Sequence, residues 1–416
     1  MEFLELSRAH PYGVRPRGDL WSAAAAGGGS GSGSGSGGRR SGGRRSGEKT
    51  SRGAASRARG LGPRLALLAD GLLLSGALSM LGGGDLARLS RASRFAYALA
   101  HHDALWRHLV LGALAGGDLD CLDYRGSWKE TFARGCGGGG GGGSAGAHVP
   151  VRCGSVFSDA LYQSFWCAAS NFPARWTEVE SVAREDARSL TVEDFVARYE
   201  RPTRPVILER SLDGWAAYAQ TETAAETTVT TIAAATTNTT ETTTETTITT
   251  TTTTATAKAY DHRNWTRDYL TRTAGNATFN SGGHAFSLAR YFQYADASTD
   301  DNPLYLFDKH FVRNTPQFGQ DYTPLPYFSR ERDLFEVLAG TGYRPDHRWL
   351  IVGPARSGSR FHVDPNGTSA WNAVVSGAKK WVLFPPHIVP PGVHPSEDGG
   401  DVTPPVSLVE GVRGFY

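Results

Sequence analysis

The chain has 416 residues, which is enough for two or three domains. Its 43 lysines and arginines are balanced by 41 aspartates and glutamates, so the net charge of +2 selects no class of partner and only the distribution of charge is informative. The four cysteines form no Cys-x-x-Cys pair, which argues against a disulfide framework and indicates reduced thiols of an intracellular protein.

Residues 1–60 are predicted to be a disordered basic tail. Gly27–Gly38 is a flexible glycine-serine tract, and a series of basic residues follows it with few acids between them. Two interpretations stay open: a nuclear-localisation or nucleic-acid-binding segment, and a solvated tail without a partner. The lack of aromatic residues that could stack on bases favours the second. An early acid and the lack of an apolar core argue against a secretory signal.

Residues 61–115 are predicted to be a helical module. Leucines recur at helical spacing on both sides of Gly82–Gly84, and we expect Asp85 to cap the second helix. The apolar stretch Leu65–Leu81 is too short and too interrupted to span a membrane, so we expect no membrane partner. The alternative to a docking module is a small bundle that packs on its neighbour, and His101 and His102 are expected at its surface.

The run from Asp85 to Leu111 resembles the second half of an F-box, including its late Asp-x-x-Trp-Arg. The resemblance implies that the module binds a Skp-type adaptor of a cullin ubiquitin ligase. The residues expected to make that contact are Leu74, Leu78 and Leu89.

Residues 116–155 are predicted to be a linker because the uninterrupted run Gly137–Gly143 cannot hold regular structure. Beyond it, Thr191 is expected to cap a helix, and Arg204–Glu209 is expected to form a strand. The tract 221–257 is almost wholly threonine and alanine. It lacks the apolar alternation that would bury one face, so we predict a disordered surface loop.

The most informative stretch begins at His362-Val363-Asp364. Two residues apart on a strand, the imidazole and the carboxylate project from the same face. They are two thirds of the facial triad that holds non-haem Fe(II). Pro365-Asn366-Gly367 predicts a turn directly afterwards. Two further strands are predicted, at Trp371–Val375 and at Lys379–Phe384.

The whole run from Arg360 to Pro386 closely resembles the Jumonji C (JmjC) family of Fe(II)- and 2-oxoglutarate-dependent oxygenases, in the branch of the bifunctional arginine demethylase and lysyl hydroxylase. The resemblance implies an α+β fold in which residues 156–416 form a double-stranded β-helix of the cupin or jelly-roll type. The helical F-box-like module would precede this domain, and 221–257 would be an insertion into it.

The resemblance also implies the roles of individual residues. His362 and Asp364 would bind Fe(II), and Lys379 would supply the cation for the distal carboxylate of 2-oxoglutarate. Three further residues are expected to contact the co-substrate, with Tyr294 as the alternative to the last of them: Ser359, Asn372 and Tyr291. The substrate would be a protein side chain, as in a histone or an RNA-associated protein, in the nucleus or in nucleus and cytoplasm.

One part of the family pattern is not found. The family's third iron ligand is a histidine on a later strand, but this sequence stops at Tyr416. His387 and His394 lie in a proline-rich segment that is a loop in the family, so we do not assign them as ligands. We therefore expect a β-helix that is incomplete at the C-terminus and that binds Fe(II) weakly. The alternative function is a non-catalytic F-box/JmjC adaptor that recruits targets to a ubiquitin ligase.

Overall fold

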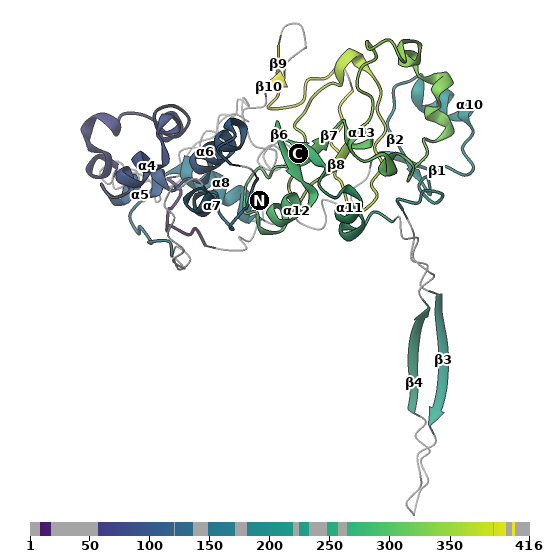
Figure 1. Ribbon diagram of the computed structural model, residues 1–416, viewed down its shortest axis with the longest axis horizontal. Helices are drawn as coiled ribbons and strands as arrows, with labels where there is room; N and C mark the ends of the chain where they lie inside the picture. Colours follow the sequence, from purple (N-terminus) through teal and green to yellow (C-terminus); the bar gives the residue numbers. More distant parts are fainter. Residues whose placement is uncertain are drawn as a thin grey trace, which may run out of the picture.

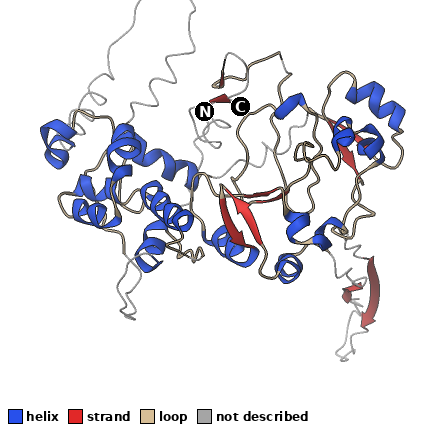
Figure 2. Cartoon of the chain, turned by 45° about the horizontal axis from the view of Figure 1, so that its top comes forward, coloured by secondary structure: helices blue, strands red, loops and turns tan. Residues whose placement is uncertain are grey.

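The computed structural model describes residues 9–17, 57–119, 121–135, 149–170, 181–218, 224–232, 248–256, 264–385, 387–396 and 402–403. Most of the basic tail and the run Gly137–Gly143 lie outside these residues, so the predictions made for them are not tested here. The helices of the N-terminal half gather at one end of the molecule, and the short strands lie toward the other end among long loops and further helices (Figures 1 and 2).

The N-terminal half of the described chain is helical. After the helix Arg57–Leu65, its helices are α3 (Asp70–Leu72), the π-helix η1 (Leu73–Ala77), the 3₁₀ helix η2 (Leu78–Met80), α4 (Gly83–Ser90), α5 (Arg94–Ala100), α6 (Asp103–Gly116), α7 (Trp128–Gly135) and α8 (Asp159–Ala169). The glycines at 82–84 separate η2 from α4 as predicted, but Gly82 rather than Asp85 is the N-cap residue. Helix α7 lies within the range that the sequence predicted to be a linker.

Part of the predicted tail is ordered. Arg15 pairs with Phe157 in a parallel bridge, and the Ser158 amide donates to the Arg15 carbonyl. Val14 is buried in the main core. Residues 9–17 therefore pack against the segment before α8, which corrects the prediction for this part of 1–60.

No single described helix is long and apolar enough to cross a membrane. One bent pair of helices, Arg57–Leu65 with Asp70–Met80, meets the length and composition test with a bend of 67°.

A small second unit follows. Strands β1 (Ala183–Asp186) and β2 (Val206–Glu209) pair in parallel. In the sequence, α10 (Val192–Phe195) and the π-helix η3 (Val196–Glu200) lie between them. The side chain of Thr191 accepts a hydrogen bond from the Asp194 amide and caps α10, as the sequence predicted. The predicted strand at 204–209 is confirmed as β2.

The threonine-rich tract differs from its prediction. β3 (Ala224–Ile232) and β4 (Ile248–Thr256) pair antiparallel along their whole length, and the hairpin projects away from the body of the molecule (Figure 1). Branching at Cβ favours extended backbone in threonine, and cross-strand hydrogen bonds do not require a buried face. The sequence predicted a disordered surface loop for the tract 221–257, and these two segments of it are paired in the structure.

The remaining elements build the region around the motif. They are α11 (Arg267–Ala274), β5 (Thr278–Ser281), β6 (His284–Ser287), α12 (Leu288–Ala297), β7 (Leu306–Asp308), α13 (Phe311–Asn314), the 3₁₀ helices η4 (Pro316–Gly319), η5 (Pro326–Phe328), η6 (Arg330–Arg332), η7 (Leu334–Leu338) and η8 (Pro365–Gly367), and the strands β8 (Leu350–Val352), β9 (His394–Pro395) and β10 (Val402–Thr403). Within the described residues the strands pair two by two: β5 with β6, β7 with β8, and β9 with β10.

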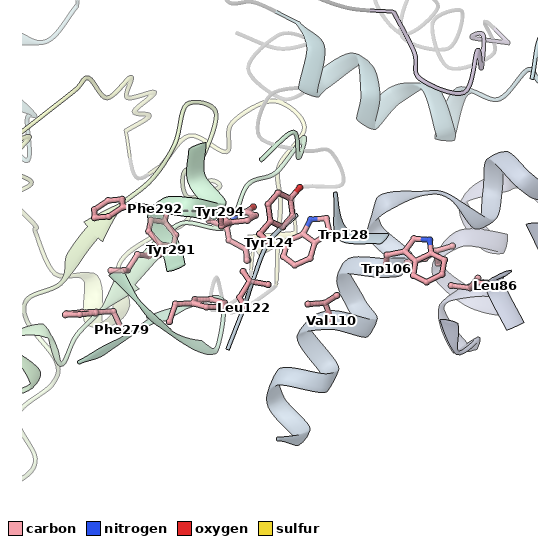
Figure 3. Packing of buried hydrophobic residues seen from close by; sticks show 14 of the residues in the cluster. Leu86, Trp106, Val110, Leu122, Tyr124, Trp128, Phe279, Tyr291, Phe292 and Tyr294 are labelled. Atoms are coloured by element: carbon pink, nitrogen blue, oxygen red, sulfur yellow. Dashed lines mark hydrogen bonds between the residues drawn. The ribbon is translucent and has the colours of Figure 1, made fainter. Parts of the chain in front are cut away.

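One hydrophobic core joins the helical module to the strand region. Trp128 and Tyr124 lie between α6 and α12, with Val110 on one side and Tyr294 on the other (Figure 3). Trp128 is fully buried, and its ring lies 5.6 Å from that of Tyr294. Burial of large aromatic side chains dominates core energetics, so we describe the two regions as one packed body.

Candidate functional site

The motif stretch begins where strand β8 ends. β8 pairs antiparallel with β7, and the chain then passes through Gly353 and Pro354 toward His362. The three strands that the sequence predicted between 360 and 384 are not formed in this structure, and the prediction is wrong at this level. The chain there is irregular apart from the turn η8, which falls at the predicted turn. A strand requires a hydrogen-bonded neighbour, and none of the described strands pairs with this stretch.

The predicted metal ligands lie together. The Nε2 atom of His362 is 3.4 Å from an Oδ atom of Asp364. The Nδ1 atom of His362 lies 2.7 Å from the carbonyl oxygen of Arg360. A carbonyl only accepts, so Nδ1 carries a proton, and in the neutral imidazole the lone pair of Nε2 lies on the side of Asp364. Both side chains are partly open to solvent, at 54% and 38% exposure.

This geometry fits two of the three protein ligands of a facial triad. A separation of 3.4 Å allows both atoms to bind one cation at the usual distance of about 2 Å. The carbonyl of Arg360 fixes the tautomer, as an outer partner of a metal-bound histidine does. Among the described residues no group of three or more histidine, cysteine or acidic side chains gathers at one point, so neither His387 nor His394 completes the set.

The predicted co-substrate residues Lys379 and Asn372 also lie together. The ammonium of Lys379 donates to the amide oxygen of Asn372 over 3.1 Å and lies 5.9 Å from the ring centre of Trp381. Lys379 is exposed as a residue, but crowding around its ammonium desolvates the charge and lowers its pKa from the usual lysine range. An incoming carboxylate would restore the favourable environment of that charge.

Ser359 pairs with a residue that the sequence did not single out. Its hydroxyl lies 2.9 Å from the hydroxyl of Tyr305, which immediately precedes β7. The two residues are 54 positions apart, so only the antiparallel pairing of β7 with β8 brings them together. The signal in the sequence was Tyr305 itself, an aromatic residue directly before the strand Leu306–Asp308. Tyr305 is a further candidate for contact with the co-substrate.

Tyr291 has a different position from the predicted one. It is buried, and its hydroxyl donates to the carbonyl oxygens of Val352, over 2.6 Å, and Leu304, over 3.2 Å. Burial raises the pKa of the phenol well above its usual value, so it stays protonated as a donor. The alternative, Tyr294, is also buried and donates to Asp300. Both tyrosines support the backbone around β7 and β8 here, and neither hydroxyl is directed to Lys379 or Asn372.

Aromatic side chains anchor the chain next to Asn372. The ring of Trp371 stacks on that of Phe328 at 5.7 Å and 11°, and it meets Trp215 edge-on at 6.0 Å. Phe328 belongs to the 3₁₀ helix η5, and Trp215 follows β2. Such ring pairs add about 1 kcal/mol beyond the area they bury. They hold Asn372 in place although no sheet does.

A surface hollow of about 450 Å³ lies elsewhere, between α6 and β6. Arg107, His108, Leu111 and His284 line it, and it contains no residue of the motif. We therefore do not count it as part of the site.

Similarity to known proteins shows the family of the chain. A family model described as a cupin-like domain matches residues 192–410. The arginine-specific demethylase JMJ22 of Arabidopsis thaliana is 38% identical over 360 residues, which is 86% of this chain and 60% of that protein. The bifunctional arginine demethylase and lysyl-hydroxylase psr-1 of Caenorhabditis elegans is 33% identical over 235 residues, or 52% of this chain and 47% of that protein. The 2-oxoglutarate and iron-dependent oxygenase JMJD4 of Homo sapiens is 40% identical over 139 residues, or 29% of this chain and 32% of that protein.

The fold class is thus that of a cupin-like domain. Within that class the chain belongs to the JmjC family, as the motif stretch indicated. It spans 60% or less of the length of each of these relatives. The F-box resemblance stays a prediction.

Proposed function

We propose that the protein is an Fe(II)- and 2-oxoglutarate-dependent oxygenase that acts on a protein side chain, and that its cupin-like domain is of the double-stranded β-helix type. The observation that carries the proposal is the His362–Asp364 pair, whose imidazole Nε2 and carboxylate oxygen lie 3.4 Å apart, close enough to share one cation. The lysine–asparagine pair, in the same stretch of chain, adds a site for the dicarboxylate.

His362 and Asp364 would hold the iron, and a third ligand would have to come from outside the described residues. When bound, iron and 2-oxoglutarate together supply the oxidation of the substrate by O2. Lys379 would bind the distal carboxylate of the co-substrate through a charge-assisted hydrogen bond, and Asn372 would orient the ammonium. Ser359 and Tyr305 would offer hydroxyl groups to the same molecule.

The names of the relatives support a class of substrate. They include an arginine demethylase and a combined arginine demethylase and lysyl hydroxylase. We therefore propose that the substrate is a basic side chain of a protein such as a histone or an RNA-associated protein. We also propose that the protein is nuclear and that its Arg-rich tail binds nucleic acid.

A binding experiment tests the co-substrate site. Titration calorimetry with 2-oxoglutarate and Mn²⁺, a redox-inert probe, should give saturable binding to the full chain. Lys379→Ala removes the cation and should weaken binding about tenfold or more, because charge-assisted hydrogen bonds are worth about 1.5–3 kcal/mol. Lys380→Ala is the matched control, since it removes an adjacent ammonium from the same exposed segment. Equal loss in both variants would show that Lys379 has no specific role.

A second proposal concerns the F-box-like module and the leucines through which it would bind an adaptor. Leu78 is buried in the core, and Leu74 and Leu89 are partly buried against it, so these leucines support the fold. Leu67 and Leu72 instead expose large apolar side chains, at 85% and 63%. We propose that these two exposed leucines, rather than Leu78, bind a Skp-type adaptor.

The test for these leucines is a pull-down with purified adaptor. Leu67→Asp and Leu72→Asp should abolish capture without changing the melting temperature, because both side chains are exposed. Undiminished capture by both variants would exclude these leucines as the adaptor site.

A further inference from the structure

One residue of α6 and one of α7 contact a buried carboxylate of the strand region. Asp300 lies in the loop between α12 and β7, and its side chain is only 4% exposed. The indole Nε1 of Trp128, from α7, donates to both of its oxygens over 2.8 and 3.0 Å. The guanidinium of Arg107, from α6, lies 3.5 Å from the same carboxylate and donates to the carbonyl of Asn302 over 2.8 Å. Arg107 of α6 and Trp128 of α7 thus both contact the loop between α12 and β7.

The same carboxylate holds the chain that leads to β7. Tyr294 donates its hydroxyl proton to Asp300 over 2.8 Å, and that hydroxyl oxygen accepts a hydrogen bond from the Leu304 amide over 2.8 Å. The Leu304 carbonyl accepts from Tyr291. Both main-chain polar groups of Leu304 are therefore bound to side chains of α12.

The next residue is Tyr305, whose hydroxyl meets Ser359 at 2.9 Å. Its carbonyl accepts from the Ser281 hydroxyl over 2.8 Å, so the main chain on this side is also fixed. Ser359 stands three positions before His362. A series of contacts thus runs from α6 and α7 to the edge of the candidate site: an ion pair and hydrogen bonds reach Leu304, the main chain continues to Tyr305, and a hydrogen bond joins Tyr305 to Ser359.

We propose that Arg107 and Trp128 are positioning residues for the oxygenase site, which act through Asp300 and Tyr294 to hold Tyr305 against Ser359. This inference rests on the proposed function for its consequence, but not for the hydrogen bonds themselves. It gives the helical module a role in binding 2-oxoglutarate, distinct from docking an adaptor.

The charge balance explains why Arg107 matters. Burial raises the pKa of Asp300, while the Arg107 charge acts in the opposite direction and favours the carboxylate. A buried carboxylate that loses its cationic partner takes up a proton or turns toward water. Either change disturbs the acceptor that Tyr294 uses, and Leu304 and Tyr305 lose their fixed position.

Two readouts on the full chain test the proposal. Arg107→Leu should speed amide hydrogen exchange of residues 304–308 and should weaken the binding of 2-oxoglutarate with Mn²⁺ about tenfold, because a shift of about 1 Å at a binding group is costly. Arg107→Lys keeps the charge and should retain most of both properties. Arg290→Ala is the matched control, since it breaks an exposed contact of 3.1 Å between α12 and Asp123 that does not reach Asp300.

Trp128→Phe serves if Arg107→Leu does not fold, because it removes the indole donor and keeps an aromatic ring in the core. Unchanged exchange at residues 304–308 in these variants would overturn the proposal, as would an equal effect of Arg290→Ala. Faster exchange with unchanged 2-oxoglutarate affinity would also overturn the positioning role. Failure of the unmodified protein to bind 2-oxoglutarate would instead reject the proposed function, and the series of contacts would then be judged on exchange alone.

Discussion

At the scale of single residues, the site depends on the state of two side chains. The Arg360 carbonyl forces the proton of His362 onto Nδ1 and leaves Nε2 as a ligand. Lys379 must be charged to attract a dicarboxylate, although its surroundings lower its pKa. Both features follow from neighbours within a few positions, so a local motif was sufficient to predict these residues.

The lowered pKa of Lys379 predicts how co-substrate binding depends on pH. The ammonium loses its proton at a lower pH than an ordinary lysine, and bound 2-oxoglutarate stabilises the protonated form. Affinity should therefore be full at neutral pH and fall as the pH rises through the pKa of the free site. Calorimetric titrations across the alkaline range measure this.

Lys379→Arg is the control for that pH series, because a guanidinium stays protonated throughout the range. Its affinity should be nearly independent of pH. A wild-type affinity that stays constant up to the pKa of an ordinary lysine would contradict the account.

Residues whose partners are distant were not predicted. Tyr305 meets Ser359 only because β7 pairs with β8, and Tyr291 is occupied by the carbonyls of Leu304 and Val352. The sequence placed Tyr291 at the co-substrate by family resemblance, and the hydrogen bonds of its hydroxyl are the reason for the correction. A single sequence contains no signal for which carbonyl a buried phenol will reach.

At the scale of elements, local chemistry was predictive where neighbours in sequence decide the outcome. Thr191 caps α10, and the glycines at 82–84 interrupt the helices. The motif strands failed because a strand depends on a partner that the described residues do not supply. Val363 and Trp381 are consequently exposed in this structure.

The helix α6 contains a histidine cap that was predicted to be a surface residue. The Nδ1 atom of His102 accepts from the Ala104 amide over 3.3 Å, and Nε2 lies 3.3 Å from the Ser164 hydroxyl. Burial, and then the nearby His10, lower the pKa of His102 to about 4. His102 is half-buried and His101 is buried. The ring Nδ1 of His101 donates a hydrogen bond to the backbone carbonyl of Tyr97.

This cap predicts a loss of stability in acid. The unfolded chain takes up a proton on His102 near its ordinary pKa, but the folded chain does so only near pH 4. The free energy of unfolding should therefore fall as the pH drops from the ordinary histidine pKa toward 4, by up to about 1.4 kcal/mol per pH unit from this group.

Denaturant unfolding at several pH values measures that slope. His102→Asn keeps an oxygen acceptor for the cap and removes the titration, so its slope in this window should be smaller. An equal slope in wild type and variant would show that other groups account for the acid sensitivity.

At the scale of the whole molecule, the main correction concerns the boundary between the helical module and the cupin-like domain. Composition predicted a linker at 116–155, but α7 lies there and Trp128 is buried against Tyr294. The contact from Trp128 to Asp300 spans 172 positions, and residue spacing alone does not encode such a pair. The run Gly137–Gly143 dominated the composition of this range, so composition did not predict the short amphipathic helix α7 before it.

The proposed function requires that His362 and Asp364 bind a divalent metal ion. The most direct test is titration of the full chain with Mn²⁺, followed by electron paramagnetic resonance, in wild type, His362→Ala and His387→Ala. His387 is an exposed histidine of the later proline-rich segment, so its removal should leave the affinity unchanged. We expect His362→Ala to weaken Mn²⁺ binding at least about tenfold, because even outer partners of metal ligands contribute that much. Equal affinity of wild type and His362→Ala would contradict it.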